Sequence, residues 1–250
     1  MPELPEAERA RRQIETALGR KVAHVDDADT YVCRPHSPGE LDSALSGRTL
    51  TSAHRRGKFL WVETDGGEGP VLGLHLGMAG RIVVDAEPAA RNWDRFAIDF
   101  AGGGRLALFD KRRLGRATLN PDYSHVGPDA REIGAKTFAE RFGRGTMAIK
   151  ARLLDQGVLA GVGNLLADET LWQAKLDPRR QAGELTDDEL KRLHRKLRQA
   201  TDAAIKDGGV HTGTFIAHRK RGATCPRCGA DVQRATIGGR TTFWCPHDQV

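Results

Sequence analysis

The sequence has no long apolar run and few aromatic residues, and these absences exclude several kinds of protein. Aromatic residues make up 6% of the 250 positions, and hydrophobic residues make up 39%. No apolar run approaches the roughly 20 residues that a membrane-spanning helix needs, and the N-terminus lacks the apolar core of a signal peptide. We therefore expect a cytoplasmic protein with no membrane partner.

Cysteine is also scarce and unevenly placed. The chain has four cysteines. Cys33 stands alone, whereas Cys225, Cys228 and Cys245 fall in the last 26 residues. This distribution is typical of a metal site in a reducing compartment and not of a disulfide framework. Zinc accepts cysteine, histidine or aspartate ligands in a tetrahedron, so we expect one structural Zn²⁺ whose fourth ligand is Asp248 or His247. A hairpin without metal is the alternative, and Cys33 is interpreted as a small apolar residue.

Charge of one sign predominates. The net charge is +6 with 39 lysines and arginines, which cluster at residues 9–12, 55–58, 111–116 and 219–221. A single basic cluster is commonly a solvated face. Four clusters spaced along the chain favour a polyanionic partner, and nucleic acid is the expected one.

The first half of the chain has the pattern of a β-rich domain. Apolar spacing predicts a helix over residues 5–18, which Gly19 ends. Short apolar runs separated by glycine-rich or acidic turns predict strands at Phe59–Val62, Val71–Leu74, Ile82–Val84, Phe96–Phe100 and Leu106–Phe109. Together they indicate an antiparallel β-sandwich.

The second half of the chain is predicted to be helical. Turn residues at 120–122 and 127–129 place a domain boundary near residue 130. Helices are expected over 148–155 and 164–174. Thr186 and Glu189 form a capping box at the start of a third helix, which ends at Gly208.

The first residues carry an unusual chemical possibility. If Met1 is removed, Pro2 becomes a secondary amine with a pKa near ~8, which is able to attack a sugar C1′ and form an iminium. The neighbouring Glu3 is a candidate general acid and base. The structural alternative is that Pro5 begins a helix whose positive end favours the acidic residues.

Three further motifs indicate contacts with DNA. Two glycines precede Asn164, so the backbone there is able to approach a phosphate, and Lys150 lies upstream; the alternative is a simple helix end. Arg240, between the cysteine pairs, is placed to reach a phosphate. Met78 follows a strand on a turn, where it either wedges into a base stack or packs in the core.

Four motifs together carry a family resemblance: Pro2–Glu6, Gly57–Leu60 with His75–Gly80, Gly161–Asn164 and the C-terminal cysteines. The chain resembles the formamidopyrimidine-DNA glycosylase and endonuclease VIII family over its whole length. The resemblance implies an α+β fold of two domains: an N-terminal antiparallel β-sandwich with an N-terminal helix, and a C-terminal helix-two-turn-helix bundle with a zinc-finger hairpin. The expected boundaries are 1–130, 131–215 and 216–250.

The resemblance also implies a monomeric, nucleoid-associated repair enzyme for damaged double-stranded DNA. Such an enzyme flips the damaged nucleotide, removes the base and cuts the backbone by β,δ-elimination. The residues at the family's catalytic positions are Pro2, Glu3, Glu6 and Lys58. Those at its DNA-binding positions are Lys58, Met78, Arg112, Leu114, Lys150, Asn164 and Arg240.

Three departures from the family pattern qualify this expectation. Leu114 stands where one branch usually carries phenylalanine, so the wedge against the opposite strand is smaller. Only 15 residues separate Gly209 from Cys225, which resembles members without the loop that closes over 8-oxoguanine. Ring-opened purines or oxidised pyrimidines are therefore the expected lesions. The third departure is Asp248, which stands at the position of the family's usual fourth cysteine.

Two other functions compete with the leading one. The first is a catalytically weak family member that recognises abasic or crosslinked sites by shape, and it predicts that Pro2 and Glu3 are dispensable. The second is an RNA- or ribosome-binding zinc protein, which accounts for the charge and the cysteines but gives no reason for the Pro2–Glu3 pair.

Overall fold

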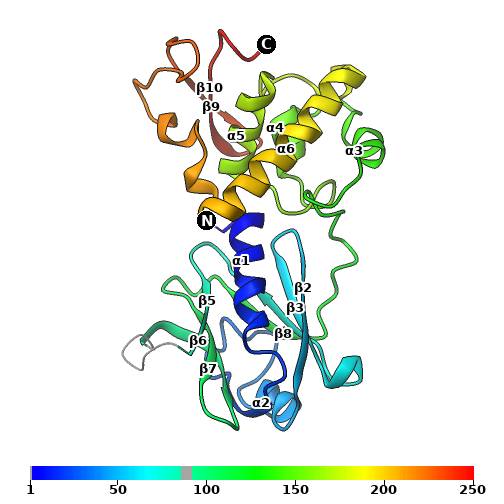
Figure 1. Cartoon of the computed structure of the whole chain (residues 1–250), viewed down its shortest axis with the longest axis vertical. Coiled ribbons are helices and arrows are strands. Elements are labelled where there is room, and N and C mark those ends of the chain that lie inside the picture. The colour runs from blue at the N-terminus through cyan, green and yellow to red at the C-terminus, as the bar shows by residue number, and fades with distance from the viewer. Residues whose placement is uncertain (1, 86–91) are drawn as a thin grey trace. The chain divides into compact units, whose positions relative to one another are not determined.

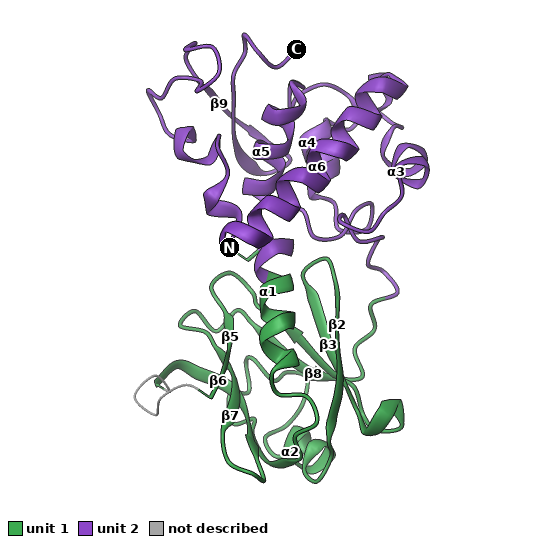
Figure 2. Cartoon of the chain, viewed as in Figure 1, with its two compact units in different colours: residues 1–2, 7–123 green, residues 3–6, 124–250 purple. Residues whose placement is uncertain are grey.

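The computed structural model describes residues 2–85 and 92–250. Met1, whose removal would free the amine of Pro2, lies outside the described residues. The chain divides into two compact units, of which unit 1 comprises residues 1–2 and 7–123 and unit 2 comprises residues 3–6 and 124–250 (Figure 2). The three domain ranges expected from the sequence, 1–130, 131–215 and 216–250, stay predictions. Among the described residues, no helix has both the length and the apolar character required to cross a membrane.

Unit 1 contains two antiparallel four-stranded sheets, as the sequence pattern predicts (Figure 1). One sheet has the order β1-β6-β7-β5 and the other has the order β2-β3-β4-β8. The strands span Val22–Asp26 (β1), Leu50–Arg56 (β2), Phe59–Thr64 (β3), Leu72–His75 (β4), Arg81–Val84 (β5), Asp94–Phe100 (β6), Arg105–Phe109 (β7) and Arg116–Leu119 (β8).

The core of unit 1 forms where the sheets and two helices bury their apolar faces. In β3, Leu60, Val62 and Thr64 are buried and alternate with half-buried residues, as expected for a strand with one covered face. Helix α1 (Leu4–Glu15) contributes Ile14 to the same cluster, and the short α2 (Glu40–Leu45) contributes two leucines. Helix α1 ends earlier than expected, because residues 16–19 form turns and Gly19 has φ +79°.

Unit 2 is a helical bundle with a C-terminal hairpin. Its helices are α3 (Ala135–Phe142), α4 (Ile149–Leu154), α5 (Asn164–Ala174) and α6 (Asp187–Asp207). Thr186 and Glu189 form the predicted capping box of α6, and Gly208 ends this helix with φ +112°. Most of α5 is buried beneath α6 and the other helices, so it forms the centre of the bundle. Strands β9 (Gln233–Ile237) and β10 (Arg240–Trp244) form the hairpin.

Candidate functional site

A buried carboxylate lies at the N-terminus of α5. Glu3 is 1% exposed, and its oxygens accept hydrogen bonds from the backbone N–H groups of Gly163 (3.0 Å), Leu165 (2.9 Å) and Leu166 (3.0 Å). The first N–H groups of a helix have no partner within the helix and carry partial positive charge. The bundle therefore stabilises negative charge on Glu3 and fixes the position of the carboxylate next to Pro2.

The glycines before Asn164 have a structural reason in this packing. A Cβ on Gly163 would lie 2.3 Å from Cδ of Glu3. Gly161 has φ +110°, and its carbonyl accepts the backbone N–H of Leu4 at 3.0 Å. These glycines thus hold the N-terminal segment against α5, which the sequence pattern alone does not indicate.

Glu6 connects the same segment to the end of α6. Its Oε2 accepts the backbone N–H of Glu3 at 2.9 Å, and its Oε1 accepts that of Val210 at 2.8 Å. Gly209 has φ +132°, and a Cβ at this residue would lie 2.5 Å from Oε1 of Glu6. Glu6, which the resemblance places among the catalytic positions, therefore contacts the backbone of Glu3 directly.

Lys150 lies inside a buried charge network. Its side chain is 0% exposed, and its Nζ donates to Asp168 at 2.5 Å. Arg219 binds the other oxygen of Asp168 at 2.7 Å. Burial lowers the pKa of Lys150 although Asp168 opposes this shift. The geometry departs from the direct phosphate contact expected from the sequence, because the ammonium faces Asp168 and not solvent.

The same network reaches Asn164 and the hairpin. The carbonyl of Thr241 accepts hydrogen bonds from Asn164 Nδ2 (3.0 Å), Lys150 Nζ (3.4 Å) and Arg219 (3.3 Å). Arg240, the residue before Thr241, is exposed at the start of β10. The structure therefore brings Asn164 close to the backbone that carries Arg240.

In unit 1, Lys58 lies in the turn between β2 and β3. Gly57 precedes it with φ +60°, which a tight turn requires. The end of β4 lies nearby, because Phe59, the residue after Lys58, pairs with His75. Burial and the charge of Lys58 both lower the pKa of His75. The backbone N–H of Gly77 donates to Nδ1 of His75 at 3.1 Å, which assigns the neutral ring its proton at Nε2. His75 has no assigned role among the sequence-based site residues, although it lies in the motif that contains Met78.

Two neighbouring turns of unit 1 present the residues expected to fill the void in DNA. Met78 is 40% exposed. A Cβ on the adjacent Gly77 would lie 2.4 Å from the backbone carbonyl carbon of Leu114, so the two turns are in contact. Arg112 is exposed and Leu114 is half-buried. We call Met78, Arg112 and Leu114 the wedge surface.

The second of these turns is built by a buried aspartate that the sequence analysis missed. Asp110 is 0% exposed and accepts the backbone N–H groups of Arg112 (2.9 Å), Leu114 (2.8 Å) and Gly115 (2.7 Å). Its place directly before the basic cluster is the available signal, since aspartate commonly bonds to the backbone of following residues. Asp110 therefore determines the conformation of the turn that carries Arg112 and Leu114.

The three C-terminal cysteines form a cluster suited to zinc. The sulfur atoms of Cys225, Cys228 and Cys245 all lie within 4.8 Å of one another. Burial raises the pKa of the Cys225 thiol, but hydrogen bonds from the Trp172 indole and from backbone N–H groups outweigh it and lower the pKa to about 7. A thiolate is the form that binds metal. The donor set fits a zinc site.

The expected fourth ligand has other partners in this structure. Asp248 forms ion pairs with Arg227 and, at 3.4 Å, with Lys175. The guanidinium of Arg227 also stacks on Trp172 at 3.9 Å from the ring centroid. His247 is exposed beside the cluster in sequence.

Comparisons with known proteins cover nearly the whole chain. The family model described as the formamidopyrimidine-DNA glycosylase N-terminal domain matches residues 1–117, and the H2TH domain model of the same enzyme matches residues 126–215. A zinc finger found in FPG and IleRS matches residues 222–250. This match and the cysteine cluster show a structural zinc site.

Similar proteins with established names are formamidopyrimidine-DNA glycosylases. A formamidopyrimidine-DNA glycosylase of Nocardioides is 34% identical over 98% of this chain and 93% of its own, and one of Arabidopsis thaliana is 34% identical over 100% of this chain and 71% of its own. The Lactococcus lactis Fpg in complex with abasic-site DNA has a TM-score of 0.86 at 30% identity over 99% of both chains. Its complex with Fapy-dG DNA has a TM-score of 0.86 at 31% identity over 99% of both chains. The expected fold class is confirmed, and the chain belongs to the formamidopyrimidine-DNA glycosylase family.

Proposed function

We propose that this protein is a base-excision repair DNA glycosylase with abasic-site lyase activity, which acts through the amine of Pro2. The observation that carries the proposal is the buried Glu3 carboxylate, held beside Pro2 by three N–H groups at the start of α5. A buried polar group held by this many donors has a fixed position, as a proton-transfer residue requires.

The chemistry begins when the neutral Pro2 amine attacks C1′ of the damaged nucleotide. The C1′–N bond to the base breaks, the base leaves with a proton, and an iminium links Pro2 to the opened sugar. Loss of a proton from C2′ then expels the 3′ phosphate, and a second elimination expels the 5′ phosphate. Glu3 is the group placed to exchange protons in these steps, and Glu6 supports it through its bond to the Glu3 N–H.

Damaged duplex DNA is the proposed substrate. The Lactococcus lactis structures are complexes of Fpg with abasic-site and Fapy-dG DNA. This chain has a net charge of +6, which favours binding to the phosphates of DNA. We assign direct phosphate contacts to Lys58, Asn164 and Arg240. Lys150 is assigned a positioning role, since its ammonium holds Asp168 and the Thr241 carbonyl beside Asn164.

The wedge surface is proposed to fill the void that the flipped nucleotide leaves. Met78 is an unbranched apolar side chain exposed on a turn, and Arg112 is able to bond to the orphaned base. Unpairing and unstacking a nucleotide costs a few kcal/mol, which inserted side chains offset. Only 15 residues separate Gly209 from Cys225, so ring-opened purines or oxidised pyrimidines are the proposed lesions and 8-oxoguanine is a poor one.

The zinc site is proposed to be held by Cys225, Cys228 and Cys245. Both oxygens of Asp248 are engaged by cations, which favours His247 as the fourth ligand. Zinc bound there would hold the two ends of the hairpin that carries Arg240 together and would supply no chemistry to the reaction. We propose that the protein works as a monomer in the cytoplasm, on the DNA of the nucleoid.

An incision assay tests the proposed function. Duplexes with an abasic site, a formamidopyrimidine, 5-hydroxyuracil or 8-oxoguanine are incubated with the wild-type protein and with Pro2→Gly and Glu3→Gln variants. We expect the wild type to cleave the abasic, formamidopyrimidine and 5-hydroxyuracil duplexes, to release the base from the latter two and to act poorly on 8-oxoguanine. The variants should lose these activities. Tight binding without cleavage of any duplex would favour the alternative of a damaged-DNA-binding protein.

A further inference from the structure

An exposed indole borders the wedge surface. Trp93 is 41% exposed, whereas Trp172 and Trp244 are 6% and 3% exposed and Trp61 is half-buried. Large aromatic side chains usually bury most of their surface, so an exposed tryptophan on a well-formed domain indicates a contact surface.

The position of Trp93 is tied to the turn that carries Arg112. The backbone N–H of Asp110 donates to the carbonyl of Trp93 at 2.9 Å, and the carboxylate of Asp110 organises the residues that follow. Arg95, two residues after Trp93, donates to the carbonyl of Asp110 at 3.1 Å. Asp110 therefore bonds both to Trp93 and to the turn that carries Arg112 and Leu114.

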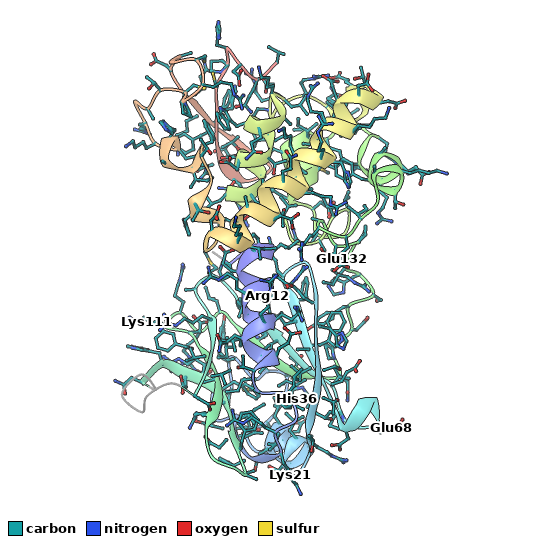
Figure 3. The ribbon with its side chains drawn as sticks, in the orientation of Figure 1. Arg12, Lys21, His36, Glu68, Lys111 and Glu132 are labelled. Carbon is teal, nitrogen blue, oxygen red and sulfur yellow. The ribbon has the colours of Figure 1, made fainter. Side chains whose placement is uncertain are left out.

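Cations surround the indole. The guanidinium of Arg95 lies 5.3 Å from the ring centroid, and Nζ of Lys111 lies 6.0 Å from it. Figure 3 shows Lys111 at the surface of unit 1. Both cations are attracted to the face of the ring, and the exposed Lys111 is also available to a phosphate.

The carboxylates of this region are turned inward. The side chains of Asp29 and Asp94 are each 9% exposed, and Asp110 is fully buried. Asp29 binds Arg113 in a bidentate pair at 2.8 Å, and Asp94 lies 3.4 Å from Arg105. Among the described residues that follow Asp110, Lys111 and Arg112 carry exposed positive charge, which suits a nucleic-acid strand.

We propose that Trp93 stacks on a nucleobase of the strand opposite the lesion, beside the void filled by the wedge surface. This inference rests on the proposed function. An aromatic ring next to basic side chains is the usual platform for an unstacked base, and such stacking tolerates any base because every base has a π-face. Trp93 thereby supplies the aromatic contact that Leu114, an aliphatic residue, does not provide.

The test compares Trp93→Leu with Trp93→Phe, which keeps an aromatic ring. The probe is a duplex with a tetrahydrofuran abasic analogue and with 2-aminopurine next to the position opposite it. We expect Trp93→Leu to weaken binding of this duplex roughly tenfold, and Trp93→Phe to stay within about threefold of the wild type. The 2-aminopurine emission should be quenched by the wild type and by Trp93→Phe, and less by Trp93→Leu.

Controls separate the contact from general effects. Met147→Ala removes a side chain of similar exposure (44%) in unit 2 and should leave binding unchanged. Trp93→Leu should retain the wild-type melting temperature, because the indole is exposed. Equal affinity and equal quenching in Trp93→Leu and wild type would overturn the proposal, and so would an equal loss on an undamaged duplex, whose bases stay stacked.

A borohydride-trapping control keeps this test distinct from that of the proposed function. At saturating protein, the wild type and the Met147→Ala control should form the covalent adduct with an abasic site at equal rates, because Met147 belongs to neither the catalytic nor the DNA-binding residues. A wild-type protein that forms no adduct contradicts the lyase function, while the binding and quenching comparison still decides the role of Trp93.

Discussion

Replacing Gly163 by alanine is expected to displace the Glu3 carboxylate without changing Glu3 itself. The added Cβ would lie 2.3 Å from Cδ of Glu3 and 2.5 Å from its Cγ and Oε1. Carbon atoms pack at roughly 3.5–4.0 Å, so the carboxylate must move by more than about 1 Å. Gly163 has φ −119° and ψ −167°, an extended conformation that alanine adopts without strain. The three atoms nearest to the added Cβ all belong to Glu3, so Glu3 is the first residue that the perturbation displaces.

The magnitude follows from the hydrogen bonds that the carboxylate accepts. Three N–H groups donate to Glu3 at 2.9–3.0 Å. A hydrogen bond to a charged group contributes about 1.5–3 kcal/mol, so losing two of them, with partial recovery from new contacts, lowers the free energy of unfolding of unit 2 by about 3 kcal/mol. A displacement of about 1 Å at a catalytic group is expected to slow adduct formation on an abasic duplex roughly 100-fold.

Urea denaturation and single-turnover borohydride trapping measure the two effects. Gly134→Ala is the matched control, since Gly134 also precedes a helix in unit 2 and a Cβ there meets no atom within 4 Å. In a Glu3→Ala background, Gly163→Ala should lower stability by less than about 0.5 kcal/mol, because the clash is gone. Wild-type stability and rate in Gly163→Ala, or an undiminished loss in the Glu3→Ala background, would refute the reasoning.

Three further predictions concern charge and metal. Burial raises the pKa of Glu8, but Arg11 and Arg55 outweigh it and lower the pKa from 4.5 to about 2. Glu8→Gln should therefore lower the free energy of unfolding by roughly 3 kcal/mol at pH 7. In denaturant titrations this difference should shrink as pH falls from 4.5 towards 2, where wild-type Glu8 takes up its proton, and a constant difference contradicts the account. Lys58→Ala should weaken binding to all duplexes and reduce the salt slope by about 1, and an unchanged slope removes it from the phosphate contacts. Cys228→Ala should release zinc, and elemental analysis showing one bound equivalent would exclude Cys228 as a ligand.

Secondary structure with local signals was predictable from the sequence. The bounds of α5 match the prediction, and the capping box located α6, because caps and apolar spacing act over a few residues. Strand β2 (Leu50–Arg56) was not predicted, because five of its seven residues are polar or charged. Its identity depends on pairing with β3, which apolar spacing does not encode.

Long-range packing limits what the sequence shows of the site. Chemistry at a free N-terminus singled out Glu3, but its donors lie about 160 residues away in the chain, where no periodicity connects them. Gly163 was interpreted through phosphate approach, whereas the structure shows that it makes room for Glu3. Lys150 was interpreted as a phosphate-binding residue, and nothing near it in sequence indicates that Asp168 pairs with its ammonium.

The measurement that tests the central claim most directly is borohydride trapping on an abasic duplex, followed by proteolysis and mass spectrometry of the adduct. Reduction converts the iminium into a stable amine. We predict a single modified residue, Pro2, at the N-terminus left by removal of Met1, and no adduct in Pro2→Gly. Attachment to a lysine, or no adduct from a protein with a verified Pro2 N-terminus and tight DNA binding, would contradict the account.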